Sequence, residues 1–381
     1  MKPTVILALL LSVAAVGHTQ NWLQRFFSPK AAVVADTIGN LPQQLEGSSS
    51  LFLMDGRYWS CNDHGQLTLY AIDTLTAAIV DSAATGVSIY DMEEVAQDDR
   101  YIYFGDMGDN NGVRDDLHVL RISKADFAAR RFLFDTISFL YPERTDSTAR
   151  NFDCEAFVAT DTALLFFTKQ WLDQGSNCYS VPNRPGHWQA RRLFSLATEG
   201  MVTGACFLPE HRLLLLCGYN SLCIPFLYFS YGFDGAAFDE GTLQRLPLSL
   251  GLGVQTEGIA TADGLHCYLT CEHLDRYGVN NPAQLFRVDL GEYLGEYLNP
   301  SQSIKPAGHG RLQVYPNPTH GLLHVPSHLL ESVEVLDTRG SVALVSRDNE
   351  WLDLTVLPSS SYLLRLKLKS GSTETIKIVK K

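Results

Sequence analysis

The feature that most constrains the fold of this chain is a repeated pattern between residues 49 and 270. Five segments align without gaps, and each contains a short strand, a polar turn and a strongly apolar strand. They are Ser49–Asn62, Glu93–Asp106, Glu155–Thr168, Thr203–Leu216 and Glu257–Thr270. Their starts are 44, 62, 48 and 54 residues apart, which is the spacing of four-stranded propeller blades. The repeat therefore predicts an all-β fold, a β-propeller of five or six blades.

Further strands complete the repeat. A third strand is expected at Leu67–Ile72, Leu117–Ile122 and Gln284–Val288. A strand at Ala31–Ile38 is placed to complete the last blade and close the ring, which removes an open sheet edge. The alternative is a β-sandwich whose segments resemble one another by accident.

The first twenty residues have the pattern of a secretory signal peptide. Lys2 precedes the apolar run Val5–Val16, and small residues at Ala15 and Gly17 suit cleavage. The alternative is a membrane anchor, although the run is short for a bilayer. No later stretch has 18 uninterrupted apolar residues, so we expect no transmembrane anchor in the mature protein. Export permits disulfides among the eight cysteines, whose pairing the sequence leaves open, as it does the alternative of buried free thiols.

The C-terminal end has its own pattern of short alternating strands and turns. It follows a linker at residues 299–311 and occupies residues 312–381, about 70 residues that suit a small Ig-like β-sandwich. The expected organisation is a signal peptide at 1–20, a propeller at 21–298, the linker and this domain.

Three motifs in this domain carry a resemblance. They are the Y-P-N-P-T-x-G run Tyr315–Gly321, the strand and turn Val333–Gly340, and the basic end Thr375–Lys381. In this order they resemble the type A C-terminal sorting domain of the type IX secretion system of Bacteroidetes. Ser359–Ser361 stands where that family usually has a glycine. The resemblance implies handling by the type IX machinery, and a secreted or outer-membrane cell-surface protein whose tail is removed or used for attachment. The alternative is an ordinary binding module.

The repeat also places acidic residues together. In a propeller the first strand of each blade starts at the rim where the second strand ends, so residues at these two points converge. The candidate ligand-binding residues chosen in this way come from four blades, and they are Asn62, Asp63, Asp91, Glu93, Asp106, Asp153, Glu155, Lys169, Glu257 and Glu272.

Convergent carboxylates repel one another unless something neutralises them. A hard cation, a shared proton, or basic partners such as Lys169 and Arg114 would do so. Oxygen ligands favour Ca²⁺ over zinc, and the candidate calcium ligands are Glu93, Asp106, Glu155 and Glu257. The alternative is that these acids bond backbone amides at strand ends.

The overall charge excludes some partners. With 30 Lys and Arg against 42 Asp and Glu, the net charge is −12, which argues against binding nucleic acid or an anionic membrane surface. The chain has no G-x-S-x-G nucleophile elbow, no P-loop and no dinucleotide fingerprint.

Several repeat motifs resemble a group of uncharacterised secreted bacterial propellers, loosely similar to the SdiA-regulated and phytase-esterase-like propellers. They are Leu45–Ser50, Trp59–Asp63, Asp91–Ala96, Tyr103–Asn110 and Asp153–Ala156, with departures at Ser50, Met92 and Asp109. The resemblance covers about residues 41–290 and implies fold more than activity.

Three functions remain open from the sequence. The first is a surface or secreted propeller that binds carbohydrate or peptide, with Trp171, Tyr219 and Tyr277 as a stacking platform for sugar rings. The second is a hydrolase of the glycosidase, phosphoesterase or lactonase type, which uses the rim carboxylates or calcium. The third is a structural component of the cell surface.

Overall fold

The computed structural model describes residues 32–146, 148–251, 253–276, 278–299, 314–325, 330–337, 340–346, 351–369 and 373–381. The expected signal peptide, and the expected linker apart from residue 299, lie outside these ranges. The chain divides into two compact units, Met1–Leu298 and Asn299–Lys381. We call them the N-terminal unit and the C-terminal unit.

The described part of the N-terminal unit contains five sheets of four or five strands that follow one another along the chain, and a two-stranded hairpin. Sheet 1 consists of β2 (Phe52–Met54), β3 (Arg57–Ser60), β4 (Gly65–Ile72) and β5 (Ile79–Ile89). Sheet 2 consists of β6 (Met92–Gln97), β7 (Tyr101–Asp106), β8 (His118–Ser123) and β9 (Asp135–Leu140), with β13 (Gly186–Gln189) added at its edge. Sheet 3 consists of β10 (Cys154–Ala159), β11 (Ala163–Thr168), β12 (Ser176–Pro182) and β14 (Arg191–Leu196).

Sheets 4 and 5 complete the series. Sheet 4 consists of β15 (Met201–Leu208), β16 (Leu213–Tyr219), β17 (Pro225–Tyr231) and β18 (Thr242–Pro247). Sheet 5 consists of β19 (Thr256–Thr261), β20 (His266–Cys271), β23 (Gln284–Asp289) and the N-terminal strand β1 (Ala35–Asn40). The pairing expected between an N-terminal strand and the last sheet is therefore present, a few residues later than predicted.

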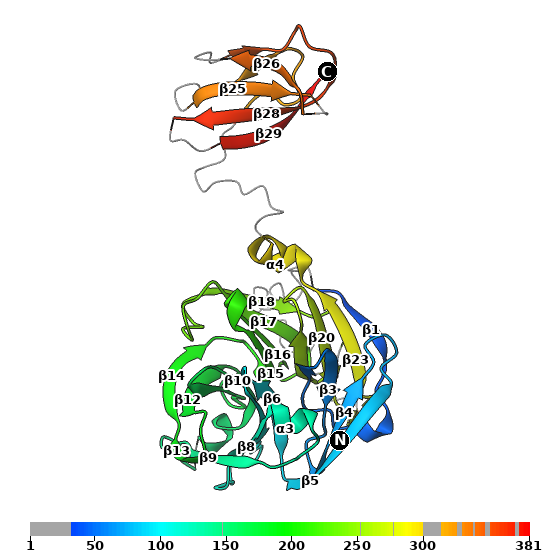
Figure 1. Ribbon diagram of the computed structural model, residues 1–381, viewed down its shortest axis with the longest axis vertical. Coiled ribbons are helices and arrows are strands. Elements are labelled where there is room, and N and C mark those ends of the chain that lie inside the picture. Colours follow the sequence, from blue (N-terminus) through cyan, green and yellow to red (C-terminus); the bar gives the residue numbers. More distant parts are fainter. Residues whose placement is uncertain are drawn as a thin grey trace, which may run out of the picture. The chain divides into compact units, whose positions relative to one another are not determined.

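The first strands of the five sheets lie side by side at the centre of the unit (Figure 1). Every residue of β10 and β19 is buried, as expected of strands covered on both faces. β6 contacts β10, β10 contacts β15, β15 contacts β19 and β19 contacts β2. Gln97 of β6 donates a hydrogen bond to the carbonyl of Leu53 in β2 at 2.7 Å. Residues from all five first strands line a cavity of about 160 Å³.

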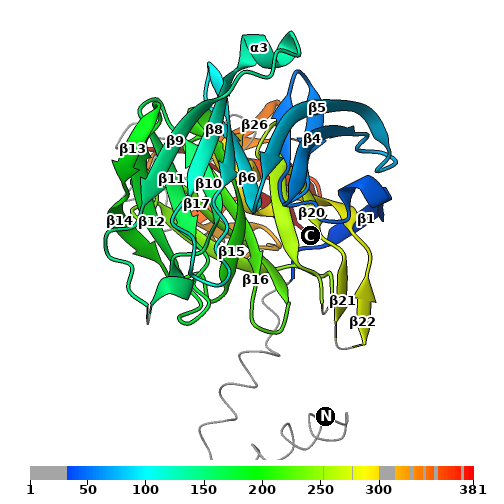
Figure 2. The same ribbon diagram turned by 90° about the horizontal axis from the view of Figure 1, so that it is seen from below.

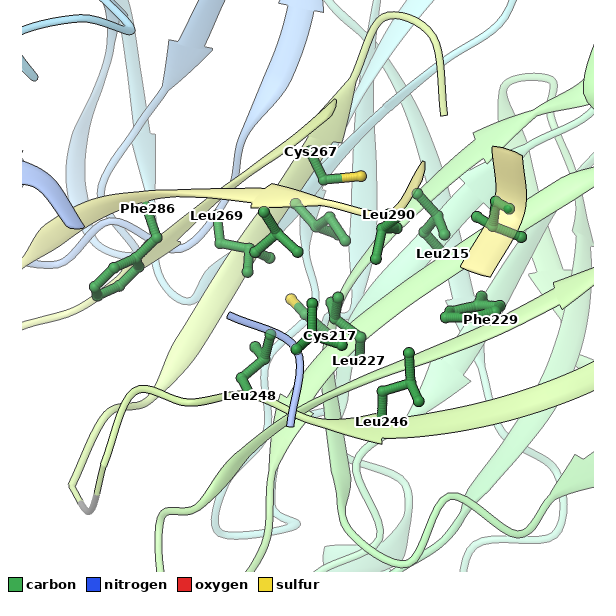
Figure 3. Close-up of a cluster of buried hydrophobic side chains, with 14 of the residues drawn as sticks. Leu215, Cys217, Leu227, Phe229, Leu246, Leu248, Cys267, Leu269, Phe286 and Leu290 are labelled. Carbon is green, nitrogen blue, oxygen red and sulfur yellow. The ribbon is translucent and has the colours of Figure 1, made fainter. Parts of the chain in front are cut away.

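The hydrophobic core lies between neighbouring sheets. Figure 3 shows Cys217 and Leu227 of sheet 4 packed near Leu269 and Phe286 of sheet 5. These side chains alternate along their strands, so one face of each sheet covers the next. All eight cysteines fall within the described residues, and none of them forms a disulfide. Six of them are the buried free thiols left open by the sequence, and Cys206 and Cys223 are free and partly exposed.

The short elements mark the two ends of the N-terminal unit. At one end of the unit, the first strand of each sheet begins, the second strand ends and the third strand begins, and we call it the site end. We call the opposite end the far end. Helix α3 (Lys124–Ala128) follows a third strand at the far end, and the hairpin of β21 (Leu274–Arg276) and β22 (Val279–Asn281) lies at the site end (Figure 2). The remaining short helices are η1 (Gln43–Leu45), η2 (Ala149–Asn151), η3 (Pro209–His211) and α4 (Gly291–Leu298). In the described ranges, no helix has the length and apolar character needed to cross a membrane.

The C-terminal unit has two sheets that share one core. β26 (Val342–Ser346), β25 (Leu330–Leu336), β28 (Ser360–Leu368) and β29 (Thr373–Lys380) form one sheet, and β24 (Leu322–His324) pairs with β27 (Trp351–Asp353) in the other. The Y-P-N-P-T run holds the last strand in place. The Asn317 side chain donates to the carbonyl of Lys377 at 2.8 Å and accepts from the amide of Val379 at 3.0 Å, and the Thr319 amide donates to the Val379 carbonyl at 2.9 Å.

Candidate functional site

A register shift recurs at the site end of the N-terminal unit. In sheet 2, Met92 pairs with Asp106 but Glu94 pairs with Gly105, so Glu93 is the extra residue of a β-bulge. Sheets 3, 4 and 5 shift by one residue at the equivalent place. The extra residues in these sheets are Glu155, Thr203 and Glu257. Bulges redirect a side chain out of the regular alternation, and they are frequent beside functional sites.

Sheet 1 also has a one-residue register shift at this place, although one of the two pairs that define it is an isolated bridge. Ser48 pairs with Asn62 in an isolated bridge, and Phe52 pairs with Trp59, so the register shifts by one residue between the two pairs. Ser49, which the repeat aligns with Glu93, lies within that interval. One residue from each sheet thus occupies an equivalent position around the centre of the site end.

Lys169 is the buried cation of this site. Its Nζ donates to Glu155 Oε1 at 2.5 Å and Oε2 at 2.6 Å, and to the Tyr219 hydroxyl at 3.0 Å. It also lies 4.7 Å from the ring centroid of Trp171. Burial acts to lower the pKa of Lys169, but Glu155 outweighs it and holds that pKa well above its usual range. Burial raises the pKa of Glu155 well above its usual range, and Lys169 opposes that rise. By their 2.5 Å contact, Lys169 and Glu155 form a buried ion pair.

Glu257 is the carboxyl group whose environment is least satisfied. It is 6% exposed, and burial raises its pKa to about 8, although Lys169 and the Tyr219 hydroxyl oppose the shift. Among the described residues, its Oε2 atom has no hydrogen-bond partner. Buried polar atoms are nearly always bonded, and an unbonded one at a functional site is a candidate contact for a ligand.

Glu93 and Asp91 form a second acidic pair. Burial raises the pKa of Glu93 well above its usual range, and the charges of Glu155 and Asp91 add to the effect. Burial and the charge of Asp153 raise the pKa of Asp91 to about 6, while a hydrogen bond from Glu93 opposes this. Both side chains lie against Gly108, where any side chain would collide with Glu93 Oε1. Gly108 is therefore needed for the close approach of its loop.

Asp153 is fully buried and bonded. Its oxygens accept from the amide of Asp109 at 2.7 Å and from the indole Nε1 of Trp171 at 2.8 Å. Burial raises its pKa, and Lys169 opposes the rise. The Trp171 ring is also contacted by Arg150, whose guanidinium lies 4.8 Å from the ring centroid. Trp171 therefore serves to hold this corner of the site.

Asp106 has a different environment from the three bulge glutamates. Its carboxylate accepts from the backbone amides of Tyr90 at 2.9 Å and Asp91 at 3.0 Å, and it pairs with Arg114 at 3.0 Å. Both oxygens are thus occupied within its own sheet. This arrangement is the one described by the alternative in which acids bond backbone amides at strand ends.

The remaining candidates lie around the edge of the cluster. Asn62 donates to the Gln44 carbonyl at 2.7 Å, and its own Oδ1 is buried without a partner in the described residues. Asp63 bonds His64 at 2.5 Å. Burial raises the pKa of Glu272, which Lys169 opposes and the charge of Asp63 reinforces. These mutual effects bring Asp63, Glu272 and Lys169 into one electrostatic cluster.

No three Asp, Glu, His or Cys side chains within the described ranges are arranged to hold a metal ion. Calcium therefore stays a prediction. The described residues instead show the third of the neutralising devices considered for the sequence, because Lys169 and Arg114 each pair with a candidate carboxylate.

Two residues of the site were missed in the sequence. Gln255 donates to the Tyr219 hydroxyl at 2.8 Å and occupies the position equivalent to Asp91 and Asp153, two residues before a bulge glutamate. The D-x-E, D-x-E and Q-x-E pattern would have revealed it. Glu94 is completely buried and accepts from the Ala205 amide of sheet 4 at 2.7 Å, which links two central strands.

Of the three aromatic residues expected to form a platform for sugar rings, Tyr219 is buried and Trp171 is partly exposed. Tyr219 is 2% exposed and bonded to Lys169. Trp171 is contacted by two cations. The third aromatic residue, Tyr277, lies outside the described residues.

Comparisons with known proteins bear mainly on the C-terminal unit. Residues 313–381 match the family described as the secretion system C-terminal sorting domain. The chain therefore carries a type IX secretion sorting domain, which indicates export to the cell surface or secretion. A search of curated proteins finds no match.

The solved structures that resemble the chain are distant. The designed protein Ika8 is 10% identical at a TM-score of 0.30, over 90% of this chain and 100% of its own. A Thermus thermophilus protein named as an oxidoreductase (glucose dehydrogenase) is 12% identical at 0.37, over 67% and 99%. The extracellular domain of BT4673 from B. thetaiotaomicron is 10% identical at 0.32, over 92% and 59%. At these TM-scores the likenesses bear on neither fold nor function.

Proposed function

We propose that this chain, whose residues 313–381 match a type IX secretion sorting domain, is an exported ligand-binding protein. Its N-terminal unit acts as a five-bladed β-propeller with sheets 1 to 5 as the blades. Support comes from the contacts between successive first strands and from the Gln97–Leu53 bond that joins the first two sheets. In this arrangement the C-terminal unit, a small Ig-like sandwich, directs export, and the site end carries the binding site.

The observation that carries the binding function is the unsatisfied carboxyl of Glu257 beside the Lys169–Glu155 ion pair. Burying a polar atom without a partner costs about 1–3 kcal/mol. A ligand that donates a hydrogen bond to Oε2 of Glu257 would recover that cost. The site therefore suits a ligand with N–H or O–H groups, either a glycan or a peptide, at a position surrounded by acceptors.

Binding of the purified mature chain to an array that holds both glycans and peptides tests this function. Glu257→Gln should lose the recognised ligand, because the replacement removes the acidic acceptor while it keeps the shape. The matched control is Glu210→Gln, since Glu210 is exposed in η3 at the far end. A chain that binds nothing on the array, or whose binding survives Glu257→Gln, would contradict the proposal.

A hydrolase is the second candidate, and one observation favours it. The pKa of Glu257 near 8 makes it an acid at neutral pH, and Glu155 bonds Lys169, which opposes the rise that burial causes in the pKa of Glu155. Two carboxyl groups in unlike environments are the usual equipment for acid and base catalysis. Glycosides, phosphoesters and lactones with chromogenic leaving groups test it. Turnover that falls at least about 100-fold in both Glu257→Gln and Glu155→Gln would support this candidate over pure binding.

A further inference from the structure

Large apolar side chains surround the site end on exposed loops. Val113, Leu172 and Leu222 lie in the connections from the second to the third strand of sheets 2, 3 and 4, and Val279 lies in the hairpin of sheet 5. Tyr90 immediately precedes Asp91. The exposed fractions of Tyr90 and of the four aliphatic side chains run from 37% to 75%. Single exposed apolar residues are ordinary on protein surfaces, but apolar residues at equivalent positions of successive sheets indicate an interaction surface.

The loops that carry these side chains are held in place by the same device. The backbone amide of Val113 donates to the Asp109 carboxylate at 2.7 Å, and that of Leu172 donates to Asn151 Oδ1 at 2.9 Å. The amide of Leu222 likewise donates to Asn220 Oδ1 at 3.0 Å. In the described residues, Val113, Leu172 and Leu222 are therefore each exposed on a loop whose backbone is held by a side-chain hydrogen bond. A fixed surface loses less entropy when a partner binds.

Three of the loops form a continuous arc across sheets 3 to 5. The Ser221 amide donates to Gln174 Oε1 at 3.2 Å, which ties the loop of Leu222 to the loop of Leu172. The Gly253 amide donates to the Cys223 carbonyl at 3.0 Å, and the Val279 side chain lies against Gly253. Leu172, Leu222 and Val279 therefore belong to one connected surface.

The cluster inside this arc is strongly acidic. Its seven carboxyl groups are Asp63, Asp91, Glu93, Asp153, Glu155, Glu257 and Glu272. Lys169 is buried among them, and the buried Arg114, which pairs with Asp106, acts on Asp91 at their edge. Lys169 is already committed to Glu155. The Glu257 side chain, which is 94% buried, has an unpartnered oxygen in the described residues. A ligand that enters the cluster is therefore stabilised by a positive charge and N–H donors.

We propose that the site end binds an extended polypeptide segment, in which one Lys or Arg side chain reaches Glu257 and the flanking apolar side chains pack on Leu172, Leu222 and Val279. This inference rests on the proposed binding function and names its ligand class. Glu257 holds its proton in the free protein at neutral pH, and a cation beside it lowers its pKa and favours the ionised form, so charge complementarity selects the basic residue. The apolar arc selects its neighbours. A glycan uses the arc less well than a peptide, because the exposed apolar side chains on its connected loops are the aliphatic Leu172, Leu222 and Val279, whereas the exposed ring of Tyr90 lies outside the arc.

A synthetic library of seven-residue peptides, acetylated and amidated at the ends, tests this inference on the full mature chain. The expected result is enrichment of Lys or Arg at one position, with Leu, Ile, Val or Phe on either side. For an enriched peptide, replacement of the basic residue by norleucine should weaken binding by about tenfold or more, measured by calorimetry. Glu257→Gln should abolish the preference for the basic residue.

The variants separate the two parts of the surface. Leu172→Ser and Leu222→Ser should each weaken the peptide about three- to tenfold while the preference for Lys or Arg remains. Leu75→Ser is the control, since Leu75 is an exposed leucine in the turn between β4 and β5 at the far end, and its binding should match the wild type. Equal loss in Leu75→Ser would overturn the assignment of the arc.

The outcomes also separate this inference from the function on which it rests. Enrichment of acidic peptides, or no peptide preference together with Glu257-dependent glycan binding, would overturn the peptide inference and leave the binding function standing. Absence of both peptide and glycan binding would overturn both. A dimer in light scattering that Leu222→Ser dissociates would show that a second copy of the chain occupies the arc, and this too would overturn the peptide inference.

Discussion

Replacing Glu257 by glutamine should stabilise the protein at high pH and leave it almost unchanged at low pH. The folded chain holds the pKa of this carboxyl group near 8, against an ordinary value of 4.5. An acid whose pKa is raised in the folded state keeps its proton after the unfolded chain has lost it. The wild type therefore loses stability as pH rises from about 4.5 to about 8, and the amide, which does not titrate, avoids that loss.

The size of the effect follows from the same two values. At about 1.4 kcal/mol for each pKa unit, the full difference between 8 and 4.5 corresponds to about 5 kcal/mol, of which about 4 kcal/mol falls between pH 5 and pH 8.5. The free energy of unfolding of Glu257→Gln, relative to the wild type, should rise by that order over this range. The C-terminal unit is common to both proteins, so it cancels in the difference.

Urea unfolding of both proteins at pH 5, 7 and 8.5, followed by near-ultraviolet circular dichroism, measures the difference. Glu210→Gln, at an exposed position of the far end, should stay within about 0.5 kcal/mol of the wild type at every pH. A Glu257→Gln curve that runs parallel to the wild type across the range would refute the reasoning. It would mean that the carboxyl group ionises as easily in the folded chain as in the unfolded one.

Three further predictions concern the ion pair, the cation and the tail. Lys169→Met should destabilise the chain by about 3–5 kcal/mol in urea, because Glu155 is left buried without its partner, and adding Glu155→Gln should recover most of the loss. If calcium binds among the carboxyl groups, as the sequence predicts, millimolar CaCl₂ should raise the melting temperature by roughly 5 °C, and Glu93→Gln should remove the shift; an unchanged melting temperature would reject calcium. Asn317→Ala should destabilise the C-terminal unit by about 1–2 kcal/mol through two lost bonds to the last strand, and protease treatment of intact cells should show less exported protein.

The repeat made much of the N-terminal unit predictable. Spacing alone located the five sheets, because each sheet needs a strand–turn–strand run of similar length. The pairing of an N-terminal strand with the last sheet followed from the unpaired edge that would otherwise remain. At the C-terminal end, the Tyr315–Gly321 motif was informative because Asn317 and Thr319 make specific bonds to the last strand.

The details of the site were harder to predict, and the reason is physical. The first strands are buried on both faces, so their sequence shows no alternation that would tell which face a residue occupies. A bulge moves one side chain by one register position, and no residue type marks it. Asp106 illustrates the limit. It aligns with the strand ends that supply Asn62 and Thr168, yet Arg114 and two backbone amides occupy its oxygens.

The order of residues around the five bulges explains why Glu257 is the carboxyl group open to a ligand. Glu93 and Glu155 belong to neighbouring sheets, whereas the sheets on either side of Glu257 contribute Thr203 and Ser49. Lys169 extends from the end of the second strand of sheet 3 and so bonds the glutamate of its own sheet. The Tyr219 hydroxyl bonds both Lys169 and Glu257, but it is uncharged and does not neutralise Glu257. A cationic ligand can therefore bind Glu257 without breaking the Lys169–Glu155 pair, whereas a ligand at Glu155 would have to break it.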